Sequence, residues 1–159
     1  MTEQHPELPP CMILIDKDGR MFHEGAEMVN QGINGFLLTN LEMDEQGRYI
    51  IRLRDQKCWV EVEDTAIVVQ RVGDDGNGTP VLSLTDGTQE PLDPSLIWVG
   101  PENVLYTKVR QGTIPARFNR PAYYQAAEWV RETGDGFAMA VNGRLFPLRE
   151  GHPGVDKEN

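Results

Sequence analysis

The chain has 159 residues, a formal net charge of -10 and 39% hydrophobic residues, a composition that allows one domain or two small ones with usable cores. The negative charge argues against nucleic acid as a partner, because binding requires cations that displace phosphate counterions, and it equally disfavours an anionic membrane surface. Its ordinary consequence is solubility. The sequence contains no run of about 18 apolar residues, so it predicts no membrane span.

The two ends of the chain are expected to be flexible. Residues 1–10 are polar and contain three prolines, and they lack both the basic start and the apolar stretch of a signal peptide. We predict a flexible lead-in over 1–10 and a flexible tail over 151–159. The two cysteines, Cys11 and Cys58, make a poor disulfide framework and a poor metal site, so we expect reduced thiols and a cytoplasmic location.

One short phrase, a polar residue, a glycine and then Arg or Thr, occurs four times. Its copies lie at 18–22, 46–51, 86–88 and 142–146. Asp-Gly and Asn-Gly between apolar runs predict hairpins with type I′ turns, in which both central residues have positive φ. The first and last copies, DGRMFHEG and NGRLFPLREG, are the most alike. We therefore expect a β-rich body built from hairpins, with two related halves.

In the first half, strands are predicted on both sides of the first turn, at 12–15 and 21–23. Residues 33–41 place apolar side chains at helical spacing, but two glycines allow only a short helix. Further strands are expected over 48–54 and 58–69. Ile67-Val68-Val69 is continuous and apolar, as in a strand buried on both faces.

The segment Gly73–Pro80 is rich in Gly and Asp and predicts a flexible connection. We take it as the boundary between an N-terminal subdomain over 11–72 and a C-terminal subdomain over 80–150. In the second half, strands are expected at 81–84, 97–99 and 104–110, followed by a hairpin of 137–141 with 145–148.

The main helix is predicted near 121–133. It begins at Pro121, a favoured first residue, and Gly134 is expected to end it in a left-handed conformation. Tyr123 and the apolar residues that follow form its buried stripe. The predicted fold class is therefore α+β: β-rich, with two small subdomains built from hairpins, a repeated motif and one main helix.

The order of these motifs resembles a bacterial family known as domain of unknown function 1285 (DUF1285). The matching segments are IDKDGRMFHEG, DEQGRYII, WVEVEDTAIVV, LTDGTQEPLDP, VLYTKVRQGTIPARFNRPAYYQAAEWV and FAMAVNGRLFPL. Two features depart from the family: Met21 stands where an aromatic residue is common, and the segment before Leu41 is less regular as a helix. The resemblance implies a two-part α+β fold with a repeated motif and a regulatory or signalling role. The family has no established activity, so it implies no catalytic residues.

Three candidate chemistries are outweighed by simpler interpretations. Calcium loops at 16–19 and 44–47 would place Gly25 and Leu53 at the position that needs a bidentate carboxylate, so hairpin turns are favoured. His23 is the sole interior histidine. A pairing of His23 with Cys58 is less favoured than a buried strand cysteine. No paired histidine spacing or C-x-x-C motif predicts a metal site, and no cofactor is expected.

The end of the predicted strand over 58–63 is acidic. Strand alternation puts Trp59, Glu61 and Glu63 on one face, with Asp64 beyond. Such carboxylates can hold an ion or act as acid and base, but a solvated strand face is the simpler interpretation. We keep Trp59, Glu61 and Glu63 as a hypothetical partner surface.

A stretch without any carboxylate, between Glu102 and Glu128, predicts an anion site. Its cations are Lys108, Arg110, Arg117 and Arg120. The first two share a strand face, and the last two precede the predicted helix, whose N-terminus carries free N–H groups. Tyr123 adds a hydroxyl donor. The alternative is that these cations bind the protein's own acidic residues.

These observations favour a non-enzymatic module that senses a small anionic ligand or regulates a process. The first alternative is a protein-interaction module that uses exposed aromatics such as Trp59 or Trp98. An enzyme comes third, because no set of nucleophile, base and metal ligands is recognisable.

Overall fold

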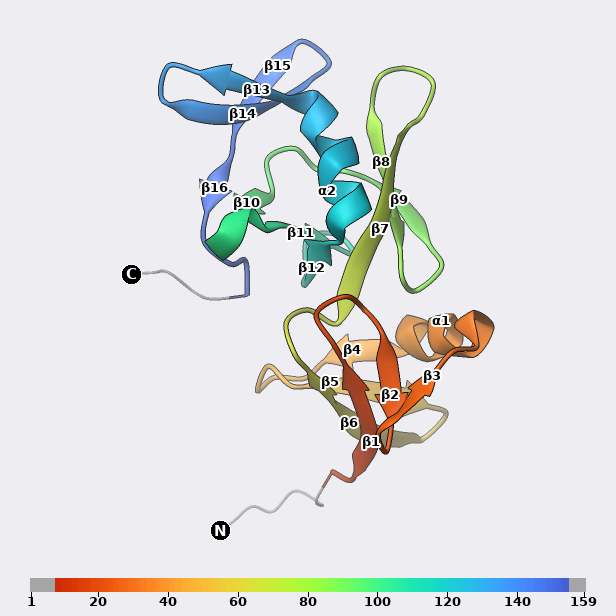
Figure 1. Cartoon of the computed structure of the whole chain (residues 1–159). Helices are drawn as coiled ribbons and strands as arrows, with labels where there is room; N and C mark the ends of the chain where they lie inside the picture. Colours follow the sequence, from red (N-terminus) through yellow and green to blue (C-terminus); the bar gives the residue numbers. More distant parts are fainter. Residues whose placement is uncertain (1–7, 155–159) are drawn as a thin grey trace. The chain divides into compact units, whose positions relative to one another are not determined.

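The computed structural model describes residues 8–154 and divides the chain into two compact units, Met1–Ala66 and Ile67–Asn159 (Figure 1). The predictions of a flexible lead-in and tail therefore fall mostly outside the described residues. Strands dominate both units, and each unit contains one short α-helix. The α+β, β-rich fold class is confirmed.

The first unit contains one six-stranded sheet in the order β3-β2-β1-β6-β5-β4. Its strands are β1 (Pro10–Ile15), β2 (Met21–His23), β3 (Ala26–Met28), β4 (Leu41–Met43), β5 (Tyr49–Leu53) and β6 (Gln56–Val62). All neighbouring pairs are antiparallel except β1 and β6, which are parallel. The helix α1 (Gln31–Thr39) connects β3 to β4.

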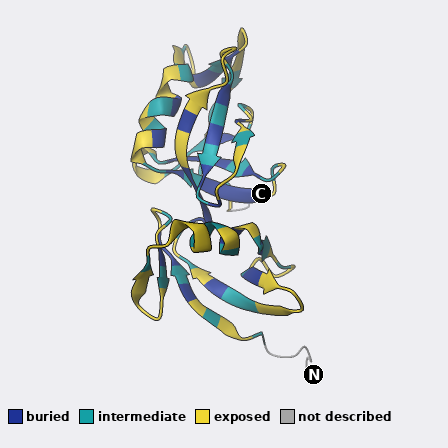
Figure 2. Cartoon of the chain, turned by 90° about the vertical axis from the view of Figure 1, so that its right-hand side faces the viewer, coloured by how far each residue is buried: buried dark blue, intermediate teal, exposed yellow. Residues whose placement is uncertain are grey.

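The core of the first unit lies under one face of this sheet. Strand alternation turns Ile13 and Ile15 of β1 and Val60 of β6 inward, and all three are buried. Figure 2 shows buried segments alternating with more exposed ones along the strands. Leu38 of α1 is also buried. The helix begins at Asn30, whose side chain accepts a hydrogen bond from the N–H of Ile33, as an N-cap does.

The pairing of β1 with β6 is interrupted by a bulge. Pro10 is aligned with Trp59, and Leu14 with Glu61, so three residues of β1 lie opposite one residue of β6. Met12, in the middle of the three, has a φ of 63°, a left-handed conformation that is uncommon for residues other than glycine. A bulge of this kind bends its strand and redirects the local side chains.

A disulfide between Cys11 and Cys58 ties β1 to β6 beside this bulge, with the two Cα atoms 5.0 Å apart. The prediction of reduced thiols is therefore wrong. Parallel pairing of β1 with β6 brings together two cysteines that are 47 positions apart in the sequence, and local patterns do not reveal that pairing. The expected cytoplasmic location rested on reduced thiols, so the disulfide removes that support.

The second unit contains a seven-stranded sheet in the order β16-β10-β11-β12-β7-β8-β9 and a three-stranded sheet, β13-β14-β15. The strands of the larger sheet are β7 (Ile67–Asp74), β8 (Pro80–Leu84), β9 (Gln89–Pro91), β10 (Ile97–Val99), β11 (Leu105–Val109), β12 (Ile114–Phe118) and β16 (Arg149–Glu150). Those of the smaller sheet are β13 (Val130–Thr133), β14 (Gly136–Val141) and β15 (Arg144–Pro147). Two short 3-10 helices, η1 (Pro101–Asn103) and η2 (Ala127–Trp129), lie between strands.

An interior strand of the larger sheet is β7, whose first three residues, Ile67, Val68 and Val69, are fully buried, as the continuous apolar run predicts. This strand pairs in parallel with β12 and antiparallel with β8. The short helix α2 (Arg120–Ala126) packs against β7, and the side-chain oxygen of Gln125 accepts the N–H of Val72 at 2.8 Å.

The division between the units differs in position from the expected one. The glycine-rich segment 73–80 is the end of the hairpin between β7 and β8, and the chain divides instead between Ala66 and Ile67. Aspartates in this loop accept backbone N–H groups: Asp74 from Gly76 and Gly78, at 2.6 and 2.9 Å. Gly and Asp are frequent in tight hairpin turns as well as in linkers, so composition alone does not distinguish them.

The main helix is shorter than predicted. It covers Arg120–Ala126, passes into η2, and gives way to strand β13 where the sequence predicts helix. Residues 130–133 form a strand because they pair antiparallel with β14, where Val130 lies opposite Met139. This tertiary pairing overrides the helical spacing of the sequence. Gly134 does not have the positive φ expected of a helix end, whereas Gly136 does.

The turns also refine the hairpin prediction. Asn142-Gly143 forms the expected turn with positive φ at both central residues. In the first copy of the repeated phrase, however, only Gly19 has positive φ, and its N–H is donated to the carbonyl of Asp16. The turn centre there lies one residue earlier, as in a type I turn followed by a glycine bulge. The first and last copies lie in different sheets, of different units.

Candidate functional site

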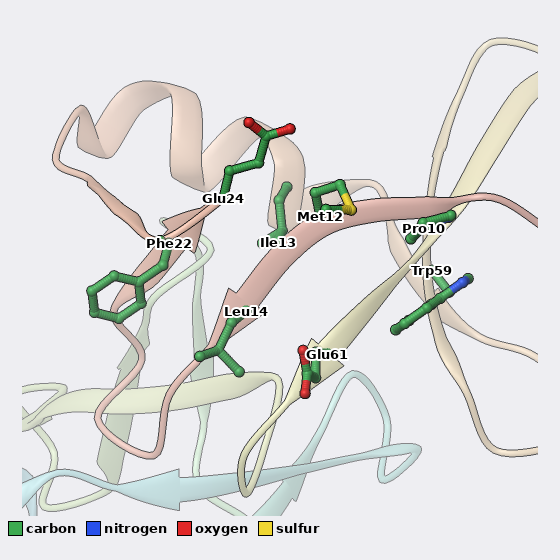
Figure 3. A pocket seen from close by; sticks show the side chains of 9 residues that line it. Pro10, Met12, Ile13, Leu14, Phe22, Glu24, Trp59 and Glu61 are labelled. Atoms are coloured by element: carbon green, nitrogen blue, oxygen red, sulfur yellow. The ribbon is translucent and has the colours of Figure 1, made fainter.

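The bulge in β1 opens a groove on the outer face of the first unit's sheet, with a volume of about 460 Å³ (Figure 3). Binding sites for small molecules usually measure roughly 300–1,000 Å³ and are mostly apolar. The groove fits that description, and it is partly open to solvent. It is lined by Pro10, Met12, Ile13, Leu14, Phe22, Glu24, Gly25, Trp59 and Glu61.

Sheet register explains why these side chains meet. Leu14 of β1 lies opposite Phe22 of β2 on one side and Glu61 of β6 on the other, so the three form a row across neighbouring strands. Trp59 lies two residues before Glu61 and therefore on the same face. Met12, which the bulge turns outward, is 53% exposed, an unusual exposure for a large apolar side chain within a strand.

Two carboxylates border the apolar surface from opposite sides. Glu24 occupies the tight turn between β2 and β3, where both it and Gly25 have positive φ, and its N–H is donated to the carbonyl of Met12. Glu61 projects from β6, on the other side of β1 (Figure 3). Within residues 8–154, neither carboxylate group makes an ion pair or a hydrogen bond.

A second groove in the same unit, of about 560 Å³, has more charged residues in its lining, and its arginines are bound internally. It runs along β4 and β5. Its arginines are paired with its own acidic residues, Arg48 with Asp44 at 2.9 Å and Arg52 with Glu42 at 2.7 Å. A ligand with charged groups would have to compete with these internal pairs, so the groove beside the bulge is the better candidate.

The hypothetical partner surface is divided by the structure. Trp59 and Glu61 both line the groove. Glu63 does not, and one of its carboxylate oxygens accepts the backbone N–H of Lys17 at 3.0 Å, which closes the first hairpin against β6. Sequence alternation thus identified two lining residues, and the third has a structural contact.

In the predicted anion cluster, Arg110 is bound to the protein's own acidic residues. Its guanidinium contacts the carboxylate of Asp86 at 2.8 Å, and its backbone N–H is donated to Glu90. Burial by itself would raise the pKa of Asp86, but hydrogen bonds from Arg110 and Thr88 outweigh burial and lower that pKa. For this residue the internal-partner interpretation describes the structure, although the partner is Asp86 rather than the 61–64 cluster.

The remaining members of that cluster are spread along β11, β12 and α2. The Lys108 ammonium lies 5.9 Å from the centre of the Trp98 ring, and the Arg149 guanidinium lies 5.3 Å from the same centre. Arg117 is half-buried on β12, opposite Tyr106.

At the start of α2, the Arg120 guanidinium reaches the Tyr124 hydroxyl at 3.4 Å, and the Tyr123 and Tyr124 rings meet edge to face. The N–H of Ala122 is already capped by Asn119. The anion site stays a prediction.

The residues of the disfavoured catalytic and calcium sites have other roles or lie apart in the structure. Cys58 is in the disulfide, so it offers no thiol to His23, which is exposed at the end of β2. Asp16 and Asp44, of the two calcium-like loops, accept backbone N–H groups in their turns. In the part of the chain that the structure describes, no group of three or more His, Cys, Asp or Glu is arranged to hold a metal ion.

Sequence reasoning missed most of the groove. Phe22 and Leu14 were assigned to strands, but nothing in their spacing shows that Glu61, almost fifty positions later, completes their row. One local signal exists: Met12 is a large apolar residue at one of the alternate positions of 12–15 that face away from the core.

Comparison with known proteins supports the fold. No family model matches the chain, and no curated protein matches it. A crystal structure of a DUF1285 family protein from Silicibacter pomeroyi is similar over 91% of this chain and 84% of that chain, with a TM-score of 0.75 and 19% identity. A DUF1285 family protein from Shewanella baltica is similar over 74% of this chain and 91% of that chain, with a TM-score of 0.62 and 16% identity.

This chain has the fold of DUF1285 family proteins. The resemblance expected from the order of motifs is thus confirmed at the level of the fold. In addition, none of the helices among the described residues is long and apolar enough to cross a membrane.

Proposed function

We propose that this protein is a non-enzymatic, ligand-sensing regulatory module whose ligand site is the groove beside the β1 bulge. The observation that carries the proposal is the bulge itself. It exposes Met12 and leaves an apolar hollow, with Trp59 and Phe22 in its lining, on the face of the sheet opposite the core. Exposed apolar surface of this kind in a concave site commonly marks a place where a ligand binds.

The chemistry of the lining favours binding over catalysis. Among the described residues, the charged side chains of the lining belong to Glu24 and Glu61, and the lining includes no His, Cys, Ser, Thr or Lys. Two carboxylates can in principle act as acid and base, but that role is typical of carboxylates that are withdrawn from solvent. Both residues here are exposed. A site of this composition holds a molecule through apolar contact and charge.

The experiment is a thermal-shift screen of the full chain against small molecules, followed by nuclear magnetic resonance (NMR) titration of any compound that raises the melting temperature. A ligand of the groove shifts the amide signals of β1 and the indole signal of Trp59. Trp59→Ala is expected to weaken its binding about tenfold, because an aromatic contact is lost. The matched control is Phe137→Ala, an exposed aromatic of the second unit. Equal affinity in both variants would refute the assignment of the site.

A protein partner is the second candidate, and a specific surface favours it. Ile33 and Phe36, three positions apart in α1, are 53% and 60% exposed, and Val29, just before the helix, is 76% exposed. The other suggested aromatic, Trp98, is half-buried and has the cations of Lys108 and Arg149 near its ring. If the protein acts through this helix face, Phe36→Asp abolishes capture of the partner, while Trp59→Ala leaves it intact.

The predicted anion site is kept as a separate hypothesis with its own test. Addition of inorganic phosphate at low millimolar concentration should move the amide signals around Arg117, Arg120 and Tyr123 if the site binds anions. An unchanged spectrum for this segment removes the hypothesis and leaves the groove proposal as it stands.

A further inference from the structure

We infer that the groove beside the β1 bulge selects apolar molecules that carry a positive charge, such as aromatic or aliphatic amines. This inference rests on the proposed function and names the class of ligand. It follows from three features of the groove: its apolar floor, its two carboxylates and the balance of charge around them.

The floor of the groove supplies affinity without selectivity for charge. Met12, Leu14 and Phe22 offer apolar surface from two adjacent strands, and Trp59 adds an indole from a third. An aliphatic or aromatic body gains from the area that it removes from water on such a surface. The volume of about 460 Å³ accommodates a body of one or two rings.

The charge around this floor is negative. Glu24 and Glu61 stand on opposite sides of β1, and within residues 8–154 neither carboxylate has an ionic or hydrogen-bonding partner of its own. Arg20 approaches the groove, with its guanidinium 5.9 Å from the centre of the Phe22 ring, but Asp16 balances its charge at 3.0 Å. Among the described residues these two carboxylates therefore stay unpaired, in a protein of net charge -10.

An ammonium group on an apolar ligand therefore meets a favourable field in this groove, and a carboxylate meets an unfavourable one. Exposed ion pairs each contribute modestly, so we expect the two carboxylates together to favour an amine over its neutral analogue by roughly three- to tenfold. The aromatic rings of Phe22 and Trp59 add cation–π attraction in the same direction.

The test uses three probes that share one apolar body: 2-(1-naphthyl)ethylamine, the matching alcohol 2-(1-naphthyl)ethanol, and the acid 3-(1-naphthyl)propionate. Each is titrated into the isotope-labelled full chain, and dissociation constants are taken from the NMR shifts of β1 and Trp59. The amine should bind most tightly and the acid most weakly. The preference should shrink when NaCl is raised from about 0.02 M to about 0.5 M, because salt screens exposed charges.

The variant Glu24→Gln/Glu61→Gln removes both charges while it keeps the shape of the side chains. It should reduce amine affinity to that of the alcohol and leave alcohol affinity unchanged. The control Glu128→Gln/Glu132→Gln changes the net charge equally, at exposed positions of the second unit, and should keep the preference.

Two failures are distinguishable. Equal binding of the amine and the alcohol at the groove overturns the charge selectivity but keeps the groove as a ligand site. No shift at β1 or Trp59 with any of the three probes overturns the proposed function and this inference together.

Discussion

At the residue scale, acidic side chains explain much of the local structure. Asp16 and Asp44 have matching contacts: each accepts the backbone N–H groups two and four residues later, and each pairs with the Arg four residues later. Asp86 differs from these two in that its side chain is almost fully buried and pairs with Arg110, a residue distant in the sequence. Carboxylates that the sequence offers as ligands or catalysts are thus used to hold turns and strands.

The Asp86–Arg110 pair predicts a pH-dependent stability. The lowered pKa of Asp86 means that its contribution is present above the unfolded-state value of about 4 and is lost as the pH falls through the lower folded-state pKa. We expect Asp86→Asn to cost about 2 kcal/mol of unfolding free energy at pH 7, since it weakens a buried pair. The difference from the unmodified protein should narrow below about pH 4.

Urea unfolding at a series of pH values measures this effect. The control is Asp135→Asn, an exposed residue, for which the difference should be near zero at every pH. A difference for Asp86→Asn that stays constant from pH 7 to pH 3 would contradict the assigned role of the pair.

At the scale of elements, the feature that positions the candidate site is the joint between β1 and β6. Parallel pairing places the two strands side by side, the bulge opens the groove, and the disulfide holds the strands together next to the bulge. The site is therefore built from backbone irregularity on a covalently fixed sheet, not from a flexible loop.

Removal of the disulfide should destabilise the first unit. Closing a loop between positions 47 apart restricts the unfolded chain, which the loop-entropy relation puts at about 4 kcal/mol, an upper value. We expect Cys11→Ser/Cys58→Ser to lower the unfolding free energy by about 2–4 kcal/mol and to weaken probe binding in the groove. Urea unfolding with and without reductant measures this. A reductant should destabilise the unmodified protein and have no effect on the double variant, and equal stability of all samples would refute the structural role.

At the scale of the whole molecule, the chain consists of two units that each have a core. Leu38 belongs to the core of the first unit and is fully buried, whereas Phe36 on the same helix is exposed. Because both residues belong to one helix, substitutions at the two positions compare a buried site with an exposed one.

We expect Leu38→Ala to cost about 3 kcal/mol, as the loss of a buried leucine does, and Phe36→Ala to cost little. Native-state hydrogen exchange should show reduced protection in the first unit and unchanged protection in β7 and its neighbours. If protection falls equally in both units, the two units unfold together as one cooperative body. The structural division at Ala66 then does not separate two regions that unfold independently.

Local patterns in the sequence were enough to predict the β-rich class, the buried strand at 67–69, the hairpin at Asn142-Gly143 and the shared face of Trp59 and Glu61. Each of these depends on residues that are close in the chain, where side-chain period and turn chemistry act directly. The resemblance to DUF1285 proteins added the overall fold, which the similar structures support.

Other features were decided only by tertiary structure. The disulfide, the parallel pairing of β1 with β6, the partner of Arg110 and the change from helix to strand at Val130 each depend on a residue distant in sequence. The groove is the clearest case. It exists because two strands far apart in the chain are aligned with unequal numbers of residues, and a linear pattern does not contain that alignment.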